Sequence, residues 1–122
     1  PFRKNTFYIY DGSGRIVKRT FRFMDDTTET RFEYNSNDQI SSELQIKNGK
    51  SGTSLSYEYD EHNNPLKVHH IVKGKTLYTD EYEYTYDENG RITHKVLRSR
   101  LFVEMIFHYW FEYDEHGNLR TR

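Results

Sequence analysis

Residues 82–92 read YEYTYDENGRI, in which alternating tyrosines lead into an aspartate, a glycine-containing turn and an aliphatic residue. Rings at every second position line one face of a β-strand, while Glu83 and Thr85 line the other. Asp87 is suited to accept backbone N–H groups at the start of a turn, and Gly90 to adopt a positive φ within it. The stretch therefore predicts a strand, a tight turn and a second strand led by Ile92.

The same phrase occurs five times. The second aromatic residues of the copies are 24, 25, 27 and 27 residues apart: Tyr10, Tyr34, Tyr59, Tyr86 and Tyr113. A period of this length indicates a repeat architecture, in which each small unit buries its apolar face against its neighbours. We therefore expect an all-β fold, an antiparallel meander of about five repeated β-hairpins. It would form a single domain over residues 1–122, either whole or as a piece of a longer array.

Each unit is expected to pair an aromatic strand with a strand led by an aliphatic residue. The second strands are predicted at residues 15–23, 39–47, 66–73 and 91–98. If the turns add no bulge, the leading aliphatic residues share the face of the rings: Ile16, Ile40, Leu66, Ile92 and Leu119. The recurring tyrosines would then stack as a row in the core. The other face would carry an acidic row, Glu33, Glu58, Glu83 and Glu112, opposed by Lys18, Lys67 and Lys95.

Unbroken alternation leaves several large apolar residues on the outward face: Val17, Phe21, Phe23, Ile71, Leu97, Phe102, Ile106 and Trp110. Either bulges reverse the alternation in those strands, or the outward face is also partly covered. We favour partial cover, because Ile106 and Trp110 lie on the face opposite Phe107 and Phe111 within one predicted strand. An uncovered apolar strip of this kind would be an association site.

Composition excludes several function classes. Hydrophobic residues make up 34% of the chain and the mean hydropathy is −1.04, yet aromatic residues reach 16%, which indicates a thin core of amphipathic rings. The net charge of −1, with acidic and basic residues interleaved, argues against nucleic-acid binding. No apolar run is long enough to span a membrane. The absence of cysteine excludes disulfides and thiolate metal sites.

No reactive constellation stands out among the polar residues. The turn aspartates are explained by local bonds to the backbone. His69 and His70 are adjacent, so they point to opposite faces of a strand, whereas His70 and His94 are expected on the ring-bearing face of neighbouring hairpins. These two are the best pair for a metal, but a place in the core is favoured. Neither a nucleophile elbow nor a phosphate-binding loop is present. We expect no catalytic residue, metal or cofactor.

The phrase Tyr-x-Tyr-Asp-x-x-Gly-Arg-Ile resembles the YD repeat of the RHS family. The resemblance is clearest at Tyr84–Ile92 and recurs at Tyr8–Ile16 and Phe111–Leu119. It implies β-hairpin repeats, which in large family members coil into a shell around a toxin or form an extended extracellular surface. Shorter bacterial members occur in secreted or envelope proteins.

The expected function is accordingly a non-enzymatic repeat scaffold or protein-interaction module, secreted or located in the periplasm or outer envelope. One alternative is a carbohydrate-binding module that uses exposed rings, with Trp110, Tyr109 and Tyr82 as candidate ligand-binding residues. A second alternative is a part of a toxin-encasing shell. Partners are expected to be a protein or a second copy of the chain. Contact would run through the Ile106/Trp110 face or through unpaired edges of an array extending from Phe2 to Leu119.

Overall fold

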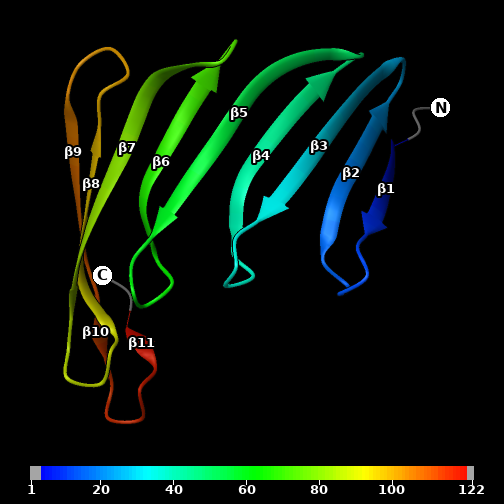
Figure 1. The fold of residues 1–122 in the computed structure, drawn as a ribbon. Coiled ribbons are helices and arrows are strands. Elements are labelled where there is room, and N and C mark those ends of the chain that lie inside the picture. Colours follow the sequence, from blue (N-terminus) through cyan, green and yellow to red (C-terminus); the bar gives the residue numbers. More distant parts are fainter. Residues whose placement is uncertain (1–3, 121–122) are drawn as a thin grey trace.

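The computed structural model describes residues 4–120 and confirms the all-β meander (Figure 1). Nine strands form one antiparallel sheet in which each strand pairs with the next in the chain. They are β1 (Lys4–Tyr10), β2 (Ile16–Phe23), β3 (Asp26–Tyr34), β4 (Ile40–Lys47), β5 (Lys50–Tyr59), β6 (Pro65–Val72), β7 (Lys75–Tyr86), β8 (Ile92–Ser99) and β9 (Met105–Trp110). A short hairpin of β10 (Glu112–Tyr113) and β11 (Leu119–Arg120) follows. Phe2, the expected start of the array, lies outside the described residues.

The five turns share one geometry, as the sequence predicts. The residue that opens each turn bonds through its backbone to the third and fourth residues after it, as Asp87 does to Gly90 and Arg91. In every turn, the residue three positions after the opening Asp or Asn has a positive φ: Gly14, Asp38, Asn63, Gly90 and Gly117. Asp38 and Asn63 replace glycine because Asx side chains tolerate this region of backbone space better than most residues.

A β-bulge follows each of the four turns of the nine-stranded sheet that open with Asp or Asn. In the fourth unit Tyr86 pairs with Ile92 but Thr85 pairs with His94, so Thr93 has no partner on β7. The equivalent shift leaves one extra residue in each of the three earlier units: Val17, Ser41 and Leu66. An extra residue moves every later side chain of the strand to the other face.

The bulges correct two of our expectations. We call the face that carries Tyr57 and Tyr82 the ring face, and the opposite face the second face. Phe21, Phe23 and Leu97 lie on the ring face, because they share rungs with Thr28, Asp26 and Tyr82. Bulges therefore place these three residues, whereas Ile106 and Trp110 do lie on the second face, opposite Phe107, as predicted. The leading residue of the third unit is Pro65, which pairs with Tyr59, whereas Leu66 is the bulged residue.

Tyrosine hydroxyls join successive units. Each of three tyrosines donates a hydrogen bond to the carbonyl oxygen of the aliphatic residue that leads the second strand of the preceding unit. These bonds are Tyr34 to Ile16 at 2.6 Å, Tyr59 to Ile40 at 2.6 Å and Tyr113 to Ile92 at 2.7 Å. We call this contact the tyrosine lock. Each lock satisfies a carbonyl and holds the ring half-buried at the junction.

The junction between the third and fourth units departs from this pattern. Tyr84, and not Tyr86, donates the lock to the carbonyl of Pro65, at 2.6 Å. Lys67 pairs with Glu81, so β7 is shifted by two residues relative to the equivalent strands of the other units. The predicted row of tyrosines is therefore wrong at Tyr86, whose hydroxyl instead bonds the carboxylate of Asp60 in the preceding turn.

The tyrosine lock makes a testable contribution to stability. Tyr59→Phe removes the hydroxyl but keeps the ring, so we expect the free energy of unfolding to fall by about 1 kcal/mol, the usual net value of one hydrogen bond. Urea denaturation monitored by circular dichroism measures the change. Tyr8→Phe, on the exposed edge strand β1, is the control and should change stability far less. Equal effects of the two substitutions would contradict the lock.

The sheet is a single layer, and no described element covers either face (Figure 1). Among residues 4–120 only Val68, Val96 and Thr30 are classed as buried. The protein exposes 9303 Å² of surface. A compact monomer of 14.8 kDa exposes about 7000 Å². The surplus, on the order of 2000 Å², is the consequence of one sheet without a second layer.

Candidate functional site

The turn aspartates act on their own backbone, as expected. In the fourth turn Asp87 Oδ1 accepts the N–H groups of Asn89 and Arg91, and Oδ2 accepts a bond from Arg91 Nε at 2.8 Å. Asp11, Asp60 and Asp114 accept equivalent pairs of backbone bonds, and Asn35 does so with its amide oxygen. The carboxylates are therefore occupied locally.

These bonds give the protein a predictable acid sensitivity. Backbone hydrogen bonds hold the pKa values of Asp11, Asp87 and Asp114 below the ordinary value of 3.8. Because a lowered folded-state pKa stabilises the fold only while the group is ionised, this stabilisation is complete above about pH 5 and is lost as the pH falls through the folded-state values. We expect urea midpoints to be level from pH 5 to 7 and to fall below pH 4. Asp87→Asn should make this drop in the urea midpoint smaller. An equal drop in the variant would show that the acid sensitivity does not come from the turn aspartates.

The three candidate ligand-binding residues do not form one surface. Tyr82 and Tyr109 lie on the ring face with Lys95 between them, its Nζ 6.0 Å and 4.8 Å from their ring centroids. Trp110 lies on the second face, because it pairs with His94 and not with Lys95. The prediction that Lys95 opposes the acidic row was wrong, since the bulge at Thr93 turns its side chain to the ring face.

Trp110 belongs instead to an aromatic cluster on the second face. Its ring is stacked with those of His94 and His108, at centroid distances of 5.0 and 5.4 Å. The two imidazoles are joined by a 3.1 Å contact between His94 Nε2 and His108 Nδ1. The expectation that His94 shares the ring face with His70 was wrong for the same reason, the bulge at Thr93. Trp110 remains 57% exposed.

The adjacent histidines point to opposite faces, as predicted, and each has a carboxylate partner on a neighbouring strand. On the second face His69 Nε2 lies 2.7 Å from Glu58 Oε2 and its Nδ1 2.8 Å from Thr79 Oγ1. On the ring face His70 Nε2 lies 3.0 Å from Asp80 Oδ2. The sequence analysis missed both pairs because it considered spacing within one strand. Only the register of β5, β6 and β7 brings these residues together.

Lys18 and Lys67 lie on the face of the acidic row, as predicted, but the ion pairs of that row are with other residues. Glu83 bonds Arg98 at 2.6 Å, and Glu58 bonds His69. Lys18 does lie on this face, but its ion pair is with Glu29, at 3.2 Å. Lys67 shares a rung with Glu58. These are exposed or half-exposed pairs that contribute little individually to stability.

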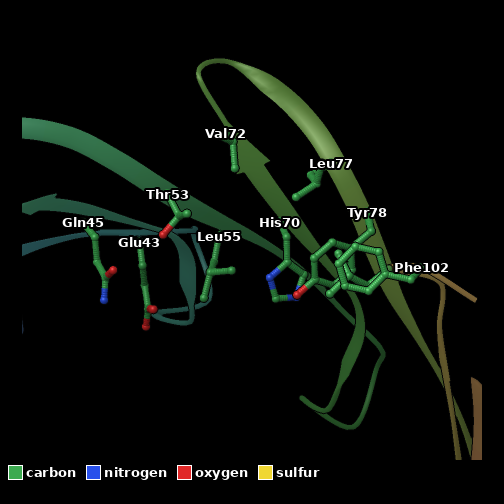
Figure 2. A pocket seen from close by; sticks show the side chains of 10 residues that line it. Glu43, Gln45, Thr53, Leu55, His70, Val72, Leu77, Tyr78 and Phe102 are labelled. Atoms are coloured by element: carbon green, nitrogen blue, oxygen red, sulfur yellow. The ribbon is translucent and has the colours of Figure 1, made fainter.

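The ring face contains a groove between the tips of the central hairpins (Figure 2). Its volume is about 540 Å³. Strands β4 to β7 and the loop after β8 supply its lining: Glu43, Gln45, Thr53, Leu55, His70, Val72, Leu77, Tyr78, Leu101 and Phe102. His70 is stacked on Tyr78 with a centroid distance of 4.0 Å. No sequence motif marks this site, since its walls come from four strands and a loop that lie between Glu43 and Phe102 in the chain.

No family model matches the chain, and no curated protein matches it significantly. The resemblance to the YD repeat therefore stays a prediction from the motif residues. Within residues 4–120, no group of three or more histidine or acidic side chains is placed to hold a metal ion. The described part of the chain also contains no helix that is long and apolar enough to cross a membrane.

Proposed function

We propose that this protein is a non-enzymatic β-hairpin repeat scaffold that presents its open sheet to another protein surface. The observation that carries the proposal is the surplus of exposed surface, on the order of 2000 Å², over a compact monomer of this mass. That surplus is comparable to the total area buried in a specific protein–protein interface, about 1600 Å². A repeat of this kind suits a secreted, periplasmic or outer-envelope setting, as the YD-repeat resemblance implies.

Strand β9 is the part of the sheet best suited to association. It forms one edge of the nine-stranded sheet, and its sequence MIFHYW contains no acidic residue, lysine or arginine. All six residues are exposed, and Ile106 and Trp110 add apolar area on the second face. An exposed apolar edge strand offers backbone groups and side chains to another strand or surface.

The chemistry of the histidine pairs supports a non-enzymatic role. Glu58, His69 and Thr79 form a carboxylate–imidazole–hydroxyl chain like that of an activated nucleophile. However, β6 pairs on both sides, so the backbone amides around His69 are engaged in the sheet and are not available as an oxyanion site. Glu58 is also more than half exposed to solvent, which weakens its effect on the imidazole.

Sedimentation velocity over a hundredfold concentration range tests the proposal. We expect the wild-type protein to associate as its concentration rises, and Ile106→Glu to suppress that association by placing a charge on the exposed apolar strip. Met24→Glu, which adds the same charge at an exposed turn between β2 and β3, is the control and should leave association unchanged. A monomer at every concentration that also retains no protein partner from a native extract would overturn the proposal.

Carbohydrate binding is the second candidate, favoured by the exposed Trp110 ring and its flanking imidazoles. A flat indole with polar edges beside it is suited to the apolar face of a sugar. A glycan array tests this function, and retention of a sugar that is abolished by Trp110→Ala would favour it. Tyr109→Ala, on the opposite face of the same strand, is the matched control.

A further inference from the structure

We propose that the ring-face groove binds a small organic amine, a primary ammonium group on an aromatic or aliphatic body. The inference goes beyond the scaffold role and does not depend on it, because the groove lies on the opposite face from Ile106 and Trp110. It rests on the shape of the groove and on the kind of polar atoms it offers.

The groove has the dimensions and walls of a small-molecule site. Its volume of about 540 Å³ falls within the range of ligand pockets, about 300–1000 Å³. Leu55 and Val72 form apolar walls from β5 and β6, and Leu77 adds another at the start of β7. Phe102, an exposed residue of the loop after β8, completes the lining, and Figure 2 shows it with the other side chains of the groove. Apolar walls on several sides favour an apolar ligand body.

Two polar groups of the groove are acceptors, His70 and Glu43, and they lie beside the N–H and O–H groups of Gln45, Thr53 and Tyr78. His70 Nε2 lies 3.0 Å from Asp80 Oδ2, and when Nε2 of the neutral ring donates to this carboxylate, Nδ1 is an acceptor. Nδ1 has no hydrogen-bond partner in the described part of the chain. The second acceptor is the half-buried carboxylate of Glu43, which faces the Tyr57 hydroxyl. Burial and Glu43 raise the pKa of Tyr57 to about 12, so this hydroxyl stays a donor. A carboxylate has sites for further donors.

Charge decides the class of ligand. Among the described residues that line the groove, only Glu43 is acidic and none is lysine or arginine, and Asp80 bonds His70 from the neighbouring strand. A primary ammonium brings a positive charge and three N–H donors, which match the Glu43 carboxylate. The stacked rings of His70 and Tyr78 add a further surface that favours a cation. A ligand carboxylate would instead meet the like charge of Glu43.

Isothermal titration calorimetry with three ligands of nearly equal shape tests the inference. We expect tryptamine to bind with a dissociation constant on the order of 1 mM, as its size allows. Tryptophol, which replaces the ammonium with a hydroxyl, and indole-3-propionate, which carries a carboxylate, should bind at least tenfold more weakly. Binding of indole-3-propionate as tight as that of tryptamine, or no tryptamine binding at 10 mM, would overturn the inference.

Two pairs of variants locate the site. Glu43→Gln should weaken tryptamine binding about tenfold, while Glu33→Gln, which makes the same change on the second face, should not alter it. Phe102→Ala should weaken binding, while Val103→Ala in the same exposed loop should not. Circular dichroism checks that each variant is folded. Wild-type affinity in both Glu43→Gln and Phe102→Ala would overturn the assignment to this groove.

Discussion

Val96→Asp is expected to lower the free energy of unfolding by at least about 3 kcal/mol. Val96 is one of three residues of the described chain that are classed as buried, with 7% of its surface exposed. It lies on the second face between Glu83 of β7 and His108 of β9. The substitution removes buried apolar area and places a carboxylate beside the carboxylate of Glu83. Arg98 is already paired with Glu83. Since domains of this kind are stable by 5–15 kcal/mol, the loss is a large share of the total.

Urea denaturation at pH 7 measures this effect, and Val103→Asp is the matched control. Val103 lies in the loop between β8 and β9 with 67% of its surface exposed, so the same substitution there should change stability by less than about 0.5 kcal/mol. Similar losses at the two positions would show that Val96 does not belong to a shared core. That result would also contradict the single-layer packing of β7, β8 and β9.

Asp60→Ala is expected to be the most damaging substitution in the turns, with a loss of about 2–3 kcal/mol. Asp60 accepts the N–H groups of His62 and Asn64 within its own turn and the hydroxyl of Tyr86 from the next unit. Each bond contributes about 1 kcal/mol. Burial raises the pKa of Asp60, but the Tyr86 hydroxyl and the two backbone donors together outweigh it and hold the pKa below its ordinary value.

Two further substitutions separate the local bonds from the bond between units. Asp87→Ala removes equivalent backbone bonds but no bond to a neighbouring unit, so it should destabilise the protein less. Tyr86→Phe should cause only the part of the stability loss that comes from the Tyr86 hydroxyl. Combining it with Asp60→Ala should lower the free energy of unfolding little further. Full additivity of the two changes in urea denaturation would contradict a direct coupling of Asp60 and Tyr86.

The irregular third junction explains why Asp60 differs from the other turn aspartates. The two-residue shift of β7 moves Tyr84 into the lock on Pro65 and carries Tyr86 one step further, onto Asp60. The ring of His62, in the same turn, is stacked on Tyr86 at a centroid distance of 3.9 Å. A repeat can thus absorb a change of register at one junction, because a second aromatic residue of the same phrase stands two positions away on the same face.

The class of fold, the number of hairpins and the position of nearly every strand follow from the amino-acid sequence. These features depend on local causes. Alternating rings such as Tyr82, Tyr84 and Tyr86 suit only a pleated strand with two unlike faces. The turn residues restrict the backbone within four or five positions. The predicted second strand at residues 91–98 differs from β8 (Ile92–Ser99) by one residue at each end.

Tertiary structure alone decided which side chains meet. The bulge at Thr93 sends His94 and Lys95 to faces opposite to those predicted, and the shift of β7 exchanges Tyr84 for Tyr86 in the lock. The His70–Asp80 pair and the groove beside it depend on the same register. Register is a property of two strands together, set by the sum of their cross-strand contacts. A side chain's face reverses with a slip of one residue, so the repeating phrase predicts the hairpins but not the partners across them.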